Sequence, residues 1–309
     1  MKQKITFYGL LHINDNDNNL NFKFNDSAQK INIYFLNAIL LAKSLKSKKF
    51  DFVLLTNNKT YLQNLNKHEF SMNIEEINFK TQVIKESHFS SCHYRIDLFR
   101  FFSSKNNYSA LIDLDVVSIN DFSANLSNLI DEKRAVFIND ISNNVIPAYG
   151  IEKIKRNLEL VLGEETELKW YGGDLFLGPP EFFGELYNAV IFTYENFKKN
   201  FHLLKDQTDE LFISAAIEIV RKKKKFNILN SREYGLLDRY WSVNTKHHQK
   251  SFYELKKNFL IHFPADKIFL SKIALDEYSN NLFLKSYIKY AMSIKKIVKN
   301  FLSKIYNFK

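Results

Sequence analysis

Runs of consecutive apolar residues alternate along the chain with segments that are apolar at every third or fourth position. The runs at 4–13, 50–55 and 110–119 each end in polar residues, which is typical of strands buried on both faces of a sheet. The segments at 31–46 and 94–102 repeat at helical spacing. This alternation of strands and helices predicts an α/β fold, with helices on both faces of a mixed, mainly parallel, Rossmann-like sheet.

The composition fits one large domain with a well-supplied core. Hydrophobic residues make up 45% of the 309 positions and aromatic residues 15%, while glycine occurs 8 times and proline 4 times. These values exclude a collagen-like or largely disordered chain. The single cysteine, Cys92, excludes a disulfide scaffold and a cysteine-ligated metal centre. The sequence contains no glycine-rich phosphate loop, which disfavours NAD-dependent and Walker-type chemistry.

The net charge of +10 is concentrated near the C-terminal end. Residues 278–309 contain seven of the 44 basic residues and none of the 34 acidic ones, so the rest of the chain is nearly neutral and nucleic-acid binding is disfavoured. Apolar residues recur at three- and four-residue steps over 284–305. This pattern predicts a basic amphipathic helix that lies on an anionic membrane surface. The alternative is a helix that packs on its own catalytic domain.

Two acids interrupt the apolar run at 110–119. Asp113 and Asp115 are one residue apart, so on a strand both side chains would face the same way. Two like charges in an apolar setting need a cation or hydrogen-bond donors between them. Mn²⁺ or Mg²⁺ would meet this need and would also bind a phosphate. The alternative is a strand end whose aspartates cap a following helix.

Three other segments carry candidate chemistry. Five of the twelve glycines and prolines lie within 172–180, which indicates either a plain turn or a crowded site, and we expect a turn at 172–174 to pack against substrate. The acids at 206–210 precede an apolar helix, where they either cap it or contact a ligand. His262 follows an apolar stretch, a setting in which a lone histidine is usually structural.

The order of these motifs resembles that of the GT-A fold, D-x-D glycosyltransferases that use nucleotide sugars. It is most similar to the retaining bacterial lipopolysaccharide glucosyl- and galactosyltransferases, a family that includes glycogenin. The resemblance covers residues 4–270 and rests on five segments, which are listed here with the family motif. They are 89–96 (Y-x-R helix), 110–119 (D-x-D), 170–178 (F-N-A-G-V-L-L), 206–211 (D-Q-D-x-L-N) and 260–267 (H-F-x-G-x-x-K-P-W).

The resemblance implies a metal and donor site. Asp113, Asp115 and His262 would hold Mn²⁺ or Mg²⁺, and Arg95 and Lys267 would lie near the donor diphosphate. The chain also departs from the family pattern, because Lys267 is one residue closer to the histidine and no Pro-Trp pair follows it.

The sugar side of the site is implied in the same way. Residues expected beside the donor sugar or its hydroxyls are Gly173, Asp174, Asp206, Gln207 and Asp209. Gly172 and Ala265 stand where the family has asparagine and glycine. Asn57, which follows the 50–55 strand, is expected to meet the nucleotide because ligands bind at the carboxyl ends of strands in open α/β sheets.

The sequence therefore predicts a metal-dependent glycosyltransferase with a GT-A catalytic domain at 1–275 and a basic helical extension at 276–309. It would move a hexosyl or N-acetylhexosaminyl group, with retention, from a UDP-sugar to a lipopolysaccharide, lipooligosaccharide or capsule acceptor. No run spans a membrane and no leader is recognised, so we expect a cytoplasmic protein that is peripheral at the inner face of the bacterial membrane. The alternatives are a non-catalytic membrane-surface protein and a sugar nucleotidyltransferase, although the latter uses a glycine-rich N-terminal loop that is missing here.

Overall fold

The computed structural model describes residues 3–13, 27–65, 72–84, 86–87, 90–205 and 207–293. The strands within these ranges are β1 (Ile5–Leu10), β2 (Asp51–Thr56), β3 (Asn73–Glu76), β4 (Tyr108–Ile112), β5 (Val116–Ser118), β6 (Val136–Asp140), β7 (Tyr171–Gly178), β8 (Ile228–Asn230), β9 (Leu237–Arg239) and β10 (Leu260–His262). None of the described helices combines the length and apolar character needed to cross a bilayer.

Helices connect most of these strands. They are α1 (Ser27–Lys46), α2 (Lys59–Leu65), α3 (Arg95–Ser103), α4 (Ala124–Lys133), α5 (Ser142–Tyr149), α6 (Ile151–Leu162), α7 (Pro180–Asn200), α8 (Asp209–Lys222), α9 (Phe252–Leu255), α10 (Lys267–Ile273) and α11 (Asn280–Ala291). Short 3₁₀ turns occur at Ser90–Tyr94 and Phe201–Leu203.

The central sheet has the order β3-β2-β1-β4-β7-β6-β8. Strands β1 to β4 pair in parallel, and β6 pairs in parallel with β8. Strand β7 runs antiparallel to both of its neighbours, β4 and β6. The predicted class is therefore confirmed as a mixed, largely parallel α/β sheet.

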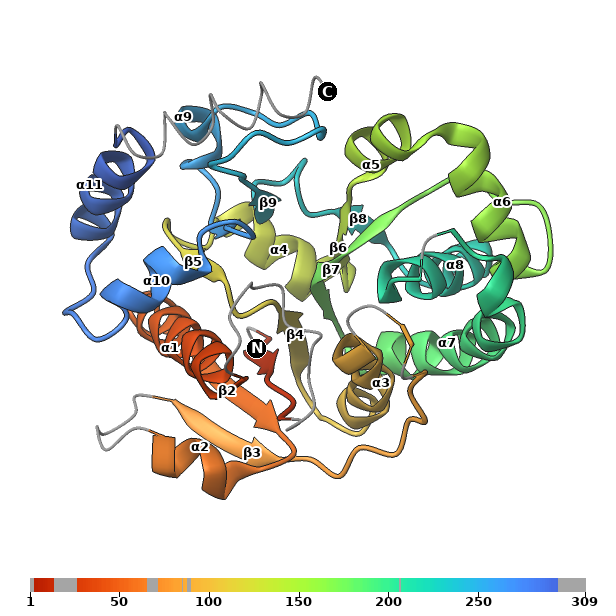
Figure 1. Cartoon of the computed structure of the whole chain (residues 1–309), viewed down its shortest axis with the longest axis horizontal. Helices are drawn as coiled ribbons and strands as arrows, with labels where there is room; N and C mark the ends of the chain where they lie inside the picture. The colour runs from red at the N-terminus through yellow and green to blue at the C-terminus, as the bar shows by residue number, and fades with distance from the viewer. Residues whose placement is uncertain are drawn as a thin grey trace.

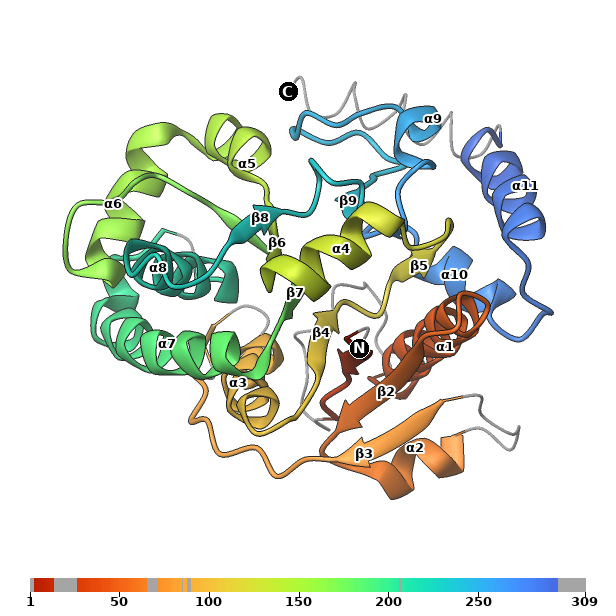
Figure 2. The ribbon, with the colours of Figure 1, turned by 180° about the vertical axis from the view of Figure 1, so that it is seen from behind.

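Different helices cover the two faces of this sheet (Figures 1 and 2). Because strand side chains alternate between faces, Phe7 packs into the cluster that contains α1 and α4, whereas Tyr8 packs into the cluster formed by α3, α6, α7 and α8. The same alternation separates Ala110 from Leu111 in β4. Burial on both faces explains why these strands read as unbroken apolar runs.

The prediction of one strand over 110–119 was wrong in an informative way. Strand β4 ends at Ile112 and β5 begins at Val116, and β5 belongs to a second, three-stranded sheet of order β5-β10-β9. The acids Asp113 and Asp115 lie in the turn between the two sheets. The chain leaves the central sheet here, so the two acids do not share a strand face. The segments predicted at 4–13, 31–46, 50–55 and 94–102 correspond to β1, α1, β2 and α3.

The helix α11 packs on the second sheet. Tyr287 is fully buried, its ring lies 4.7 Å from that of Phe263, and its hydroxyl donates to Asp266 Oδ2 at 2.6 Å. The rings of Phe252 and Phe283 join the same cluster. The described part of the predicted extension therefore shares a core with the body, which was the alternative expectation for it. Residues 294–309, which carry the rest of the amphipathic pattern, lie outside the described residues.

Candidate active site

A cavity of about 310 Å³ opens at the edge of the central sheet where β1 and β4 end. Parallel strands bring their carboxyl ends to one edge of the sheet. Residues of β9 and β10, in the second sheet, form another wall of the cavity at this edge. Polar residues from segments far apart in the sequence therefore meet there. Those that line the cavity include His12, Arg95, Asp113, Asp115, Asp209, Glu210, Arg239, His262 and Lys267.

Asp113, Asp115 and His262 form a three-residue cluster, as the sequence predicted. One ligand atom from each lies within 4.8 Å of the others. The His262 Nε2 atom is 3.2 Å from Asp115 Oδ1 and 3.7 Å from Asp113 Oδ2. Two carboxylate oxygens and one imidazole nitrogen that face a common point can bind a divalent cation. The donor set present in the protein therefore fits the predicted ion.

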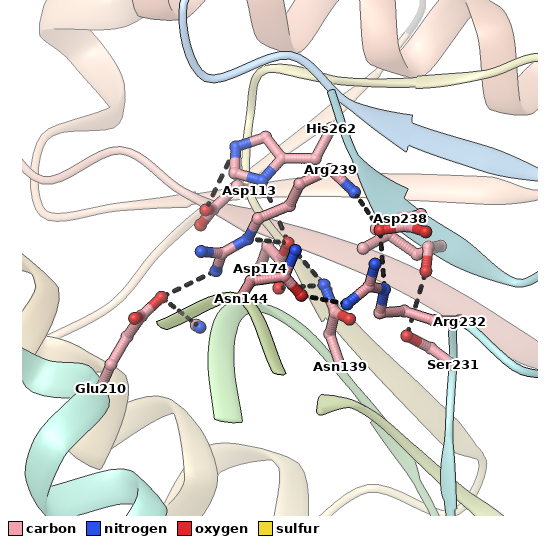
Figure 3. Close-up of polar contacts among 12 residues, drawn as sticks. Asp113, Asn139, Asn144, Asp174, Glu210, Ser231, Arg232, Asp238, Arg239 and His262 are labelled. Atoms are coloured by element: carbon pink, nitrogen blue, oxygen red, sulfur yellow. Dashed lines mark hydrogen bonds and ion pairs between the residues drawn. The ribbon is translucent and has the colours of Figure 1, made fainter. Parts of the chain in front are cut away.

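His262 is oriented from behind by Asp174. The Nδ1 atom lies 3.1 Å from Asp174 Oδ2, so with the proton on Nδ1 the histidine donates to this carboxylate and turns Nε2 towards Asp113 and Asp115. Histidine ligands of metal ions are commonly held in this way by a carboxylate. Asn139 Nδ2 donates to both oxygens of Asp174, at 3.1 and 3.0 Å, and fixes the carboxylate in place (Figure 3).

Asp174 occupies a place different from the one the resemblance implied. Its side chain is completely buried and contacts His262, Arg239 and Asn139 rather than the cavity. Burial alone would raise the pKa of Asp174, but Arg239 and the hydrogen bond from His262 hold the pKa well below its usual range. The group is therefore held as a carboxylate behind the histidine, and it is not among the described residues that line the cavity.

The two cavity acids differ in their charge environment. Burial raises the pKa of Asp113 even though Arg95 Nη2 lies 2.5 Å from Asp113 Oδ1. Burial also opposes ionisation of Asp115, but Lys267, 2.5 Å from Asp115 Oδ2, and His262 keep its pKa below the usual range. For His262, burial lowers the pKa and the neighbouring carboxylates outweigh it, raising the pKa to about 9. In the protein without a bound ion, the negative charge of the carboxylates beside His262 is therefore balanced in part by the protonated histidine.

Gly172 and Gly173 lie in the buried strand β7 and not in the turn that was expected at 172–174. The expectation of a crowded site was nevertheless correct. A Cβ atom on Gly172 would collide with Arg239, and one on Gly173 would collide with Arg95. The two glycines therefore leave room for two guanidinium groups beside the strand, so Gly173 borders the cavity through the space that it leaves empty.

Arg239 is a site residue that the sequence gave no means of selecting, and its partner Glu210 is one of the acids noted at 206–210. Arg239 Nε lies 2.6 Å from Asp174 Oδ2, and its Nη2 lies 2.7 Å from Glu210 Oε1 (Figure 3). Glu210 also accepts from the backbone amide of Gly173 at 3.1 Å and from Trp170 Nε1 at 2.9 Å. These contacts join α8, β7 and β9 at the back of the cavity. No motif marked Arg239, since it ends a strand of three residues.

The remaining predicted residues fall in three places. Asp209 lines the cavity and pairs with Arg95. Asn57 and Gln207 are not among the described residues that line it: the Asn57 amide is bonded to the backbone of Ile13 at 2.7 and 2.8 Å, and Gln207 Nε2 donates to Phe201 O at 3.2 Å. Asp206 lies outside the described residues.

Comparison with known proteins gives a limited result. No family model and no curated protein sequence matches the chain. Among solved structures, the chain is similar to galactosyltransferase LgtC in complex with donor and acceptor sugar analogs, with 11% sequence identity and a TM-score of 0.47 over 87% of this chain and 95% of that one. At this level of similarity, the function of the site must be judged from its own residues.

Proposed function

We propose that the chain is a metal-dependent glycosyltransferase that uses a nucleotide-sugar donor. The observation that supports this most is the convergence of Asp113, Asp115 and His262 at the mouth of a cavity, with Asp174 behind the histidine. In the sequence, Asp113 and Asp115 already stand out as two acids that interrupt an apolar run, and the motif resemblance adds His262. One imidazole and two carboxylates suit Mn²⁺ better than Mg²⁺, which prefers oxygen ligands.

Positive charge for the donor diphosphate would come from the ion and from two cavity side chains. The bound ion would supply a positive charge for the donor diphosphate and for the nucleotide that leaves. Arg95 and Lys267 add two fixed cations at the same cavity, and each is already held by an acid, Asp113 or Asp115. Cations placed in advance stabilise charge that develops on a leaving group without reorganising during the reaction. The nucleotide is proposed to be UDP, from the motif resemblance.

The transferred group is proposed to be a hexosyl or N-acetylhexosaminyl unit, delivered with retention to a bacterial surface glycan. This rests on the resemblance of the ordered motifs. Asp209 and Glu210 are the acids of the 206–210 segment that line the cavity, and both are paired with arginines. Their carboxylate oxygens would accept hydrogen bonds from sugar hydroxyls.

Nucleotide release from a panel of nucleotide sugars tests the proposal. The purified full chain should release UDP from at least one UDP-sugar slowly without acceptor, with Mn²⁺ and not with excess EDTA. Asp121→Asn is a matched control, because the Asp121 side chain is 91% exposed and, among the described residues, its ion pair is with Lys48. Activity that is equal with Mn²⁺ and with EDTA, or no release from any nucleotide sugar, would contradict the proposal.

Peripheral attachment to an anionic membrane is also proposed, and its test must respect the packing of α11. Five lysines lie between residues 294 and 309, and each contributes on the order of 1 kcal/mol near anionic lipid. A chain that ends at Ser293 keeps the contacts of Tyr287, so we expect it to fold and to lose binding to phosphatidylserine-containing vesicles at low salt. Equal sedimentation of both chains with these vesicles would argue against a membrane role for 294–309.

A further inference from the structure

A second, outer groove of about 400 Å³ lies beside the proposed active site. Its walls come from the end of β6, the start of α5, the turn after β8 and the loop at 248–250. A small pocket of about 10 Å³ lies between the groove and the catalytic cavity and shares wall residues with each. Arg239 and Trp241 line both the cavity and this pocket, and Asn144 and Arg232 line both the pocket and the outer groove. The proposed active site is thus bordered on one side by a further concave surface.

The rings of Trp241 and His247 line the small pocket at the border between the cavity and the groove. The rings of Trp241 and His247 are stacked, with centroids 5.0 Å apart and planes at 25°, and Tyr149 lies 5.7 Å from His247. The backbone of Trp241 is held on both sides by Gln249, whose Oε1 accepts from Trp241 N at 2.8 Å and whose Nε2 donates to Trp241 O at 2.9 Å. The stacked pair of Trp241 and His247 is therefore held in place before any ligand binds, which lowers the conformational entropy lost on binding.

The groove itself is polar, and its lining carries charges of both signs: Lys169, Arg232 and Lys250 against Asp140 and Glu233. Lys169 pairs with Asp140 at 3.1 Å, and Arg232 pairs with Asp238 at 2.9 Å and also donates to Asn144. Figure 3 shows that this second network lies next to the one around Arg239 and His262. Amides and paired ions in a shallow groove offer donors and acceptors to hydroxyl groups without a strong field for a charged ligand.

We propose that this groove binds the distal sugar residues of an oligosaccharide acceptor, while the terminal residue enters the catalytic cavity past Trp241. The inference rests on the proposed glycosyl transfer and names the acceptor class: a neutral chain of several sugars rather than a monosaccharide or a small alcohol. Aromatic faces would contact the apolar faces of sugar rings, and the amide of the exposed Asn143 would contact their hydroxyls. A longer acceptor then gains contacts that a short one lacks.

Two variants test the groove, and only the first leaves the lining of the catalytic cavity unchanged. Asn143 is exposed at the start of α5 and lines the groove but not the catalytic cavity, so Asn143→Arg fills the groove with little effect on folding. Trp241→Ala removes the aromatic border. Tyr253→Ala is the matched control, because Tyr253 is an aromatic residue that is 63% exposed and lines neither surface.

The experiment measures binding and transfer as functions of glycan length. Labelled protein with Mn²⁺ and UDP is applied to an array of bacterial core and capsule oligosaccharides of one to six sugars, and transfer to the same glycans is measured with each UDP-sugar. We expect at least tenfold tighter binding and higher kcat/KM for chains of three or more sugars than for single sugars. Asn143→Arg and Trp241→Ala should abolish this preference, and Tyr253→Ala should retain it.

The outcomes distinguish this inference from the proposed activity. Metal-dependent release of UDP together with binding that does not depend on glycan length, or on Asn143 and Trp241, would overturn the groove and leave the activity standing. Length-dependent glycan binding that is lost in both variants, in a protein that releases no nucleotide, would support the groove and overturn the activity. An array on which no glycan is bound would overturn the groove.

Discussion

Two buried histidines in this protein have opposite electrostatic settings. His262 lies among Asp113, Asp115 and Asp174, and these carboxylates overcome the effect of burial and raise its pKa to about 9. His93 lies among the rings of Tyr194, Phe197 and Phe212, and burial lowers its pKa to about 4. Both side chains are nearly inaccessible. Burial therefore does not decide the charge of a histidine; the groups that replace water do.

The two histidines also differ in whether a ring nitrogen faces the cavity. His262 keeps one nitrogen directed at the cavity acids, so a cation can replace the proton there. Both nitrogens of His93 are used inside the protein, with Ser87 Oγ at 3.2 Å and Tyr194 Oη at 3.1 Å. Only the first histidine has an atom available to a ligand. The predictions below test whether the two regions can be disturbed independently.

The largest expected effect comes from the cavity acids. Asp113→Asn should lower metal-dependent turnover about 10³-fold, or about 4 kcal/mol, because one charge that holds the cation is lost. The fold should survive, since the new amide oxygen can still accept from Arg95. Turnover of the folded protein at saturating UDP-sugar, followed over a Mn²⁺ titration, is the measurement. Activity near that of Asp121→Asn would rule out Asp113 as a ligand.

Asp115→Asn should lose turnover to a similar degree and also stability. Removing this charge leaves the buried ammonium of Lys267 among neutral groups, which include the Pro264 carbonyl, 2.8 Å away, and the Tyr34 ring. Breaking one side of a buried pair costs about 3–5 kcal/mol. Relief of repulsion between the two acids, which the sequence alone suggested, is outweighed because Lys267 and His262 already lower the pKa of Asp115. Urea unfolding of the metal-free variants compares the two acids directly.

The next effect concerns the support behind His262. Arg239→Gln removes the ion pairs to Asp174 and Glu210, so the histidine loses a fixed partner. Loss of such a supporting contact typically weakens metal affinity 10–100-fold. We expect a higher Mn²⁺ requirement with a smaller change in kcat at saturating metal, and partial recovery in Arg239→Lys. The control is Arg134→Gln, which breaks an exposed pair with Glu181. An unchanged Mn²⁺ titration would show that Asp174 needs no help from Arg239.

The sequence singled out the three clustered residues Asp113, Asp115 and His262 but not all of the residues that hold them. Asp113 and Asp115 stand out because charge interrupts an apolar run, and His262 follows from a motif order. Arg239 has no such mark: its partner Asp174 lies 65 positions earlier, and only the pairing of two sheets brings them together. The glycines at 172 and 173 correctly indicated a crowded site. The sequence could not show whether they lie in a turn or in a strand, because the groups that crowd them, Arg239 and Arg95, come from other segments.

The other sequence-level errors have the same physical origin. A buried strand that changes sheets reads as one apolar run, so 110–119 hid the turn in which the two acids lie. Apolar residues at helical spacing predict that one face of the helix is covered, but they do not identify the surface that covers it. For α11 the cover is Phe263 and its neighbours, and a lipid surface would have required the same spacing.

The smallest expected effect is acid sensitivity caused by His93. The unfolded histidine has a pKa near 6.5 and the folded one near 4, so between these values the unfolded chain binds more protons. The contribution to stability is therefore fully present above about pH 6.5 and is lost as the pH falls towards 4. We expect the free energy of unfolding to be about 1 kcal/mol lower at pH 5.5 than at pH 7.5 from this group.

His12, whose pKa burial also lowers to about 4, acts in the same direction, so the total loss of stability in acid does not identify the contribution of His93. The measurement is the difference in pH slope between the natural protein and His93→Gln in urea unfolding, with the exposed His202→Gln as control. A smaller slope only in His93→Gln supports the aromatic setting of this histidine, and identical slopes in all three proteins would place its titration in water.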